Sequence, residues 1–208
     1  KINAIVDFSP MSDLESQDWV CRSMKALGKK MDRDTAALLV FTVGRDAALL
    51  RQEMDKLANY AGDREEITSR DIEAICTKSL ECTVFQMVDA QAEGRREEAF
   101  RLLSDMEHSG EDRMGILAML LRQYRILYHA RRLGEERVSQ QNQAALLGVP
   151  PFAVTRAQLQ ARRYSQETLG AAYDALLQME YNIKSGRLPQ EGCAQTALLT
   201  LEGILKAT

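Results

Sequence analysis

The clearest regular pattern of hydrophobic positions lies in residues 112–133, DRMGILAMLLRQYRILYHARRL. Its apolar residues recur at helical spacing, namely Leu117, Leu120, Leu121, Tyr124, Leu127 and Tyr128. This spacing places them on one face of an α-helix, and Ile116, Met119 and Ile126 widen that face. A helix that is apolar over so much of its circumference is normally surrounded by other helices. We therefore predict that residues 112–133 form the central, buried helix of a helical domain.

Helix start and stop signals divide the rest of the chain into ten shorter helices. Ser12 and Glu15 have the spacing of a capping box at the start of the first, and Gly28 stops it. Asp32 or Asp34 caps the second. The predicted ranges are about 12–28, 32–44, 46–61, 68–78, 80–93, 95–108, 139–147, 151–164, 165–185 and 190 onwards. The sequence therefore predicts an all-α fold.

Residues 1–10, KINAIVDFSP, are the only part with a strand-like pattern. A single strand without a partner is not stable, and the chain starts without Met. We therefore interpret this segment as the residual strand or linker of a preceding domain, which would make the chain a fragment. The four short helices of residues 11–78 are expected to form one small domain, and residues 79–208 a second helical domain.

Composition excludes several classes of function. The chain has 208 residues, and its cysteines and histidines are few: Cys21, Cys76, Cys82, Cys193, His108 and His129. No CxxC spacing occurs, so neither a zinc site nor a disulfide framework is expected, and reduced thiols in a cytoplasmic protein are the default. There is no phosphate-binding loop, no GxGxxG and no GxSxG motif. We predict no catalytic residues, no cofactor, no metal and no membrane segment.

Charge is distributed unevenly along the chain. Residues 113–163, called the basic segment below, contain nine arginines and two glutamates, a formal charge of +7. The whole chain carries −3, so the remaining residues carry −10. This pattern favours contact with an acidic or anionic partner, although a solvated helix face explains it equally well. The candidate contacts for protein or DNA are Arg122, Arg125, Arg131, Arg132, Arg156, Arg162, Arg163 and Lys184.

One local motif suggests a different function. Residues 142–159, NQAALLGVPPFAVTRAQL, have the small-residue, turn-glycine and apolar spacing of a helix-turn-helix. A DNA-binding regulator would direct these side chains into the major groove: Thr155, Arg156, Gln158 and Arg162. The pattern is short and common, and Pro150 and Pro151 occupy the turn. Packing of two helices without DNA recognition is therefore the favoured interpretation, with the regulator as the alternative.

Several segments together resemble one family, the δ subunit of the bacterial DNA polymerase III clamp loader. They are AIVDFSP (4–10), residues 43–75 with GRDAALLRQEMDKL and ITSRDIE, SLECTVFQMVDAQAEGRREEAFRLL (79–103), LLRQYRIL (120–127), LLGVPPFAV (146–154) and NIKSG (182–186). The resemblance extends over essentially the whole chain. Two positions depart from the family pattern: Glu180 stands where Asp is usual, and Gln52 where Asn is usual.

The resemblance implies a small AAA+-type helical lid domain followed by a helical collar domain, with the N-terminal RecA-like domain absent. The family's δ subunit helps to open and load the sliding clamp in the cytoplasm and does not hydrolyse ATP itself. Its clamp contact belongs to the absent domain. The collar is expected to assemble with the other clamp-loader subunits, and DNA contact inside the assembled loader is possible.

Overall fold

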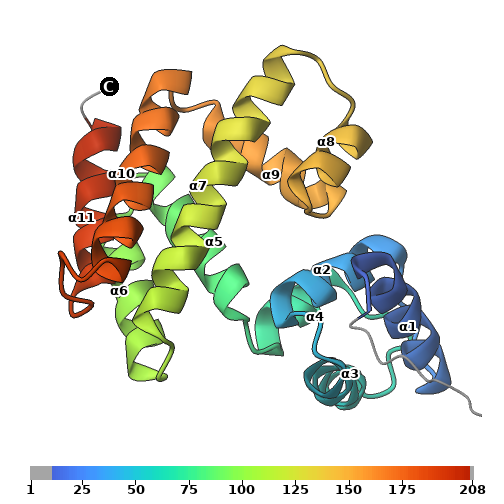
Figure 1. Cartoon of the computed structure of the whole chain (residues 1–208). Helices are drawn as coiled ribbons and strands as arrows, with labels where there is room; N and C mark the ends of the chain where they lie inside the picture. Colours follow the sequence, from blue (N-terminus) through green and yellow to red (C-terminus); the bar gives the residue numbers. More distant parts are fainter. Residues whose placement is uncertain (1–10, 207–208) are drawn as a thin grey trace, which may run out of the picture. The chain divides into compact units, whose positions relative to one another are not determined.

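The computed structural model describes residues 11–206, which form eleven helices and contain no strand (Figure 1). The predicted all-α fold is confirmed. The chain divides at Cys82 into two compact units. The strand predicted in residues 1–10 lies outside the described residues.

The N-terminal unit contains four helices. They are α1 (Asp13–Ala26), α2 (Arg33–Val43), α3 (Ala47–Ala61) and α4 (Ser69–Ile75). Their apolar faces enclose a core that includes Met24, Leu39, Leu50 and Leu57, each fully buried. Trp19 packs partly exposed against this core. The segment between α1 and α2 meets the segment between α3 and α4, where the Ile67 amide donates to the Lys30 carbonyl at 2.9 Å.

The predicted caps of this unit form as expected. The Ser12 amide donates to the Glu15 carboxylate at 2.8 Å, and the Glu15 amide donates to the Ser12 hydroxyl at 3.3 Å. This reciprocal pair is the capping box. Asp32, rather than Asp34, caps α2, because its carboxylate accepts a hydrogen bond from the Thr35 amide at 2.6 Å.

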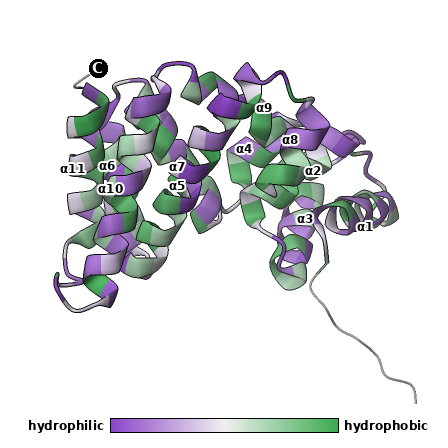
Figure 2. Cartoon of the chain, turned by 45° about the horizontal axis from the view of Figure 1, so that its top comes forward, coloured by the Kyte–Doolittle hydropathy of each residue, from purple (hydrophilic) through white to green (hydrophobic). Residues whose placement is uncertain are grey.

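The C-terminal unit is built around one long helix. The boundary between the two units falls within α5 (Leu80–Ala92). The helices that follow are α6 (Arg96–His108), α7 (Arg113–Glu135), α8 (Gln140–Leu147), α9 (Pro151–Ala161), α10 (Gln166–Lys184) and α11 (Cys193–Lys206). Helix α7 packs against α8, α9, α10 and α11, so its predicted central position is confirmed. Hydrophobic and hydrophilic residues alternate around the helices in Figure 2, as expected when each helix turns one side to a core.

The buried face of α7 differs in detail from the prediction. Leu117, Leu120 and Leu127 are fully buried, but Leu121, also predicted to be buried, is only half-buried. The buried face of α7 is centred between the two sets of apolar residues identified from the sequence, so Leu121 lies at its edge. Gln123 is buried instead.

Helices α8 and α9 meet at a short turn. Gly148 adopts a left-handed conformation at the end of α8, with φ 65° and ψ 39°. Pro151 starts α9, as predicted, at a position where its missing N–H breaks no hydrogen bond. The predicted end of α9 at Tyr164 is wrong, because the helix ends at Ala161 and tighter turns follow.

Candidate interaction surface of the C-terminal unit

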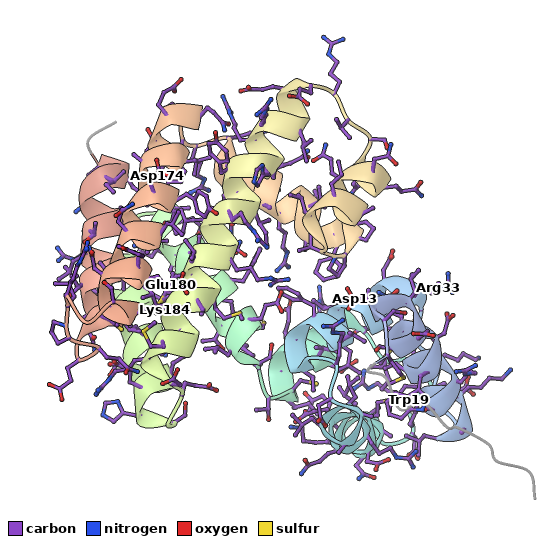
Figure 3. All side chains as sticks on the ribbon, in the orientation of Figure 1. Asp13, Trp19, Arg33, Asp174, Glu180 and Lys184 are labelled. Carbon is purple, nitrogen blue, oxygen red and sulfur yellow. The ribbon has the colours of Figure 1, made fainter. Side chains whose placement is uncertain are left out.

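The eight predicted basic contacts differ in how far their charges are neutralised. Arg131 lies 3.0 Å from Glu135, Arg132 3.0 Å from Glu136, and Lys184 2.7 Å from Glu180. All three pairs are spaced four residues apart on one helix, and Figure 3 shows the last pair along α10. Pairs with this spacing on a helix surface stabilise the helix by only about 0.3–0.5 kcal/mol. They nevertheless reduce the charge that each cation offers to a partner.

Arg156 of α9 and Arg163, two residues after the end of α9, attach this part of the chain to α5. Arg163 donates to the Ala92 carbonyl at 2.7 Å and lies 3.7 Å from Glu93. The Arg156 guanidinium lies 6.0 Å from the centre of the Phe85 ring, a cation–π geometry. These contacts give both arginines a role in packing, although both remain exposed.

A polar network beside these arginines was missed by sequence reasoning. Gln160 donates to the Asp89 carboxylate, and Gln123 donates to Gln160 at 3.4 Å. Burial raises the pKa of Asp89, while Gln160 and then Arg156 oppose that rise. The network links α5, α7 and α9. The available signal was Gln123 itself, a polar residue on the edge of the apolar face of α7.

Arg125 and Arg162 keep their charges uncompensated. Within residues 11–206, neither has a carboxylate at ion-pair distance, and both are exposed. Arg122 is half-buried on the same helix as Arg125. The predicted basic residues therefore do not act as one uniform patch, and the free charges lie at particular positions.

A surface groove of about 490 Å³ runs between α7 and α8. We call it the α7–α8 groove; it is lined by Arg125, Ile126, His129, Arg132, Leu133, Glu136, Leu146 and Leu147. Leu146 is 68% exposed, the largest exposed fraction among the large hydrophobic side chains of the described chain. An exposed leucine next to free positive charge is suited to a partner that is both apolar and acidic.

Two of the four side chains required by the DNA-regulator hypothesis, Thr155 and Gln158, are engaged in packing against α8. Gln140 of α8 donates to the Thr155 hydroxyl at 2.6 Å, and Gln158 donates to Gln143 of α8 at 2.8 Å. Both bonds join α8 to α9. The helix-turn-helix is therefore built as a packed pair, as the favoured interpretation expected.

The described residues offer no basis for metal or disulfide chemistry. In residues 11–206 no group of three His, Cys, Asp or Glu side chains could hold a metal ion. Within the described residues the four cysteines form no disulfide, and burial raises the pKa of the Cys76 thiol to about 12. In the same part of the chain no helix is long and apolar enough to cross a membrane.

Comparison with known proteins gives consistent matches. The family model of the DNA polymerase III delta subunit, C-terminal domain, matches residues 81–201. The DNA polymerase III subunit delta of Bacillus subtilis (strain 168) is 29% identical over 187 residues, covering 90% of this chain and 54% of the relative. The solved structure of the Bacillus subtilis DNA clamp loader delta protein matches with a TM-score of 0.71 and 28% identity, covering 93% of this chain and 57% of that one. The chain thus spans about half the length of these relatives. The matches give no support to the DNA-binding regulator.

Proposed function

The chain belongs to the family of DNA polymerase III delta subunits, and we propose that it acts as a subunit of a DNA clamp loader in replication. The observation that carries this proposal is the extent of one match. The Bacillus subtilis delta subunit aligns over 187 residues, more than either unit contains, so both units take part. Bacterial replication takes place in the cytoplasm, which is the compartment we expect.

In this proposal the C-terminal unit is a collar that assembles with other loader subunits. The N-terminal unit corresponds to a lid that does not hydrolyse ATP, because the sequence has no phosphate-binding loop. Contact with the sliding clamp is assigned to neither unit.

We assign the α7–α8 groove as the contact with a neighbouring loader subunit. Leu146 would be buried by association, and burying a leucine contributes about 1.5–3 kcal/mol. Arg125, which has no carboxylate at ion-pair distance in residues 11–206, would gain an acidic residue of the partner. Complementary charge of this kind orients partners and speeds their association.

The test is copurification of this chain with the ATP-hydrolysing loader subunits of the same organism. Leu146→Asp and Arg125→Glu should each weaken association by at least about tenfold. Leu146→Asp would place a charge in the buried part of the contact, and Arg125→Glu would reverse the charge offered to the partner. Leu14→Asp is the matched control: Leu14 is 65% exposed and lies on α1 of the N-terminal unit. This control should assemble like the wild type.

The two parts of the proposal fail in different ways. A wild-type chain that never joins loader subunits would refute the clamp-loader role. A chain that assembles equally well with Asp at position 146 would leave that role standing and refute the groove.

A further inference from the structure

Arg137 has an unusual backbone conformation. It follows the end of α7 with φ 56°, in the left-handed region. Every other residue with positive φ in the described chain is a glycine: Gly28, Gly44, Gly62, Gly94, Gly110, Gly148, Gly186 and Gly192. Left-handed backbone strains residues that carry a Cβ, which is why glycine is usual after a helix end. An arginine at this position therefore needs a reason other than the turn.

The turn itself does not require arginine. The Val138 amide donates to the Leu133 carbonyl at 3.1 Å, and the Arg137 amide donates to the Gly134 carbonyl at 3.3 Å. Both are backbone bonds that close the end of α7, and glycine would form them without strain. What glycine lacks is the guanidinium.

Arg137 lines a hollow of about 340 Å³ together with two other arginines. We call it the arginine hollow; it is lined by Ala130, Arg131, Gly134, Glu135, Arg137, Val138, Gln143, Gln158 and Arg162. The three guanidinium groups come from α7, from the turn after it and from the end of α9. Residues remote in sequence thus bring positive charge to one concave place.

The walls of the hollow are held by hydrogen bonds. Gln143 donates to the Val138 carbonyl at 2.7 Å, and Gln158 donates to Gln143 at 2.8 Å. Gln158 lies close against α7 at Gly134, where a Cβ would be 3.4 Å from the Gln158 amide nitrogen. These contacts therefore help to fix the shape of the hollow between the arginines.

The charges in the hollow are only partly balanced. Glu135 lies 3.0 Å from Arg131. Hydrogen bonds at the start of α10, and to a lesser extent Arg131, lower the pKa of nearby Glu167. Within residues 11–206, Arg137 and Arg162 have no carboxylate at ion-pair distance. Two uncompensated guanidinium groups therefore face a hollow that also holds the Arg131–Glu135 pair.

We propose that the arginine hollow binds a phosphate group through Arg131, Arg137 and Arg162. A guanidinium presents paired N–H donors that match phosphate oxygens, and three of them surround an anion better than one can. The phosphate belongs either to a small phosphorylated compound or to a nucleic-acid backbone. This proposal goes beyond the clamp-loader role and does not depend on it.

The first experiment titrates the whole chain with inorganic phosphate at constant ionic strength, using calorimetry. Arg137→Gly and Arg162→Gln should each weaken binding at least about tenfold, since each removes charge-assisted hydrogen bonds. The matched control is Arg22→Gln, which removes an exposed arginine of α1 that has no ion pair within residues 11–206. It should bind phosphate like the wild type.

Arg137→Gly also separates binding from folding. Glycine relieves the left-handed strain, so this variant should melt about 2–4 °C higher than the wild type without phosphate. A more stable protein with weaker phosphate binding cannot be explained by unfolding. Wild-type affinity in Arg137→Gly, or equal loss in Arg22→Gln, would overturn the site.

The second experiment identifies the source of the phosphate. Labelled single-stranded and duplex oligonucleotides are titrated at fixed salt and displaced with inorganic phosphate. Oligonucleotide binding that falls in Arg137→Gly and competes with phosphate supports the site with a nucleic-acid backbone as ligand. Phosphate binding without oligonucleotide binding supports it with a small compound. Binding of neither probe overturns the proposal.

Discussion

Replacing Asp71 with Asn should destabilise the N-terminal unit at neutral pH. The Asp71 side chain is only 7% exposed. Its carboxylate accepts hydrogen bonds from the Arg64 guanidinium at 2.9 Å, from the Thr68 amide at 2.8 Å and from the Thr68 hydroxyl at 3.0 Å. The Arg64 guanidinium, followed by the Thr68 groups, lowers the Asp71 pKa from 3.8 to about 2. The folded protein thus strongly favours the charged carboxylate.

The size of the effect follows from that shift. A lowering from 3.8 to about 2 corresponds to an upper limit of about 2.4 kcal/mol. Arg64 is 52% exposed, so water screens part of the attraction, and we expect about 1–2 kcal/mol. Because the folded pKa is the lower one, the stabilisation is fully present above about pH 4 and is lost as pH falls from about 4 to about 2.

Trp19 makes this prediction measurable. It is the single tryptophan of the chain and packs against the core of the N-terminal unit (labelled in Figure 3), so its fluorescence reports the unfolding of that unit. In urea at pH 7, Asp71→Asn should lower the midpoint by about 1 M, using a slope of about 1–2 kcal/mol per M for a small domain. Asp63→Asn, which removes an exposed carboxylate from the turn after α3, is the control.

Two results would refute the reasoning. One is a variant that unfolds at the wild-type urea concentration at pH 7. The other is a difference between variant and wild type that stays constant down to pH 2.5, where most of the charge contribution should have disappeared.

Three further substitutions test the C-terminal unit. Leu198→Ala should lower the free energy of unfolding, measured by thermal unfolding, by about 2–5 kcal/mol, because Leu198 is fully buried. Leu121→Ala at the edge of the core should lower it by about 1 kcal/mol. Equal losses in the two variants would contradict the observed packing of α7. Asp89→Asn should raise the melting temperature at pH 7, since burial raises the Asp89 pKa and the folded state therefore disfavours its charge. That gain should shrink as pH falls and the wild-type carboxyl is protonated, and a gain unchanged by pH would show that charge is not its cause.

Much of the fold could be predicted because its determinants are local. The capping box at Ser12, the Asp32 cap and Pro151 at the start of α9 each depend on residues within one helical turn. The periodicity of α7 likewise identified the central helix. Leu121 was misplaced because periodicity gives the direction of the buried face but not its width, which the neighbouring helices decide.

The candidate site was less predictable because charge compensation is a tertiary property. The excess of arginine in the basic segment could be counted from the sequence, but Arg163 bonds a carbonyl 71 residues away, while Arg162, its neighbour in sequence, faces a hollow. Arg137 was not selected as a contact, since no sequence pattern shows that its backbone is left-handed. The left-handed backbone of an arginine points to a role for its side chain only where the turn itself makes no use of that side chain. That observation makes Arg137 the residue whose replacement by glycine separates stability from binding most clearly.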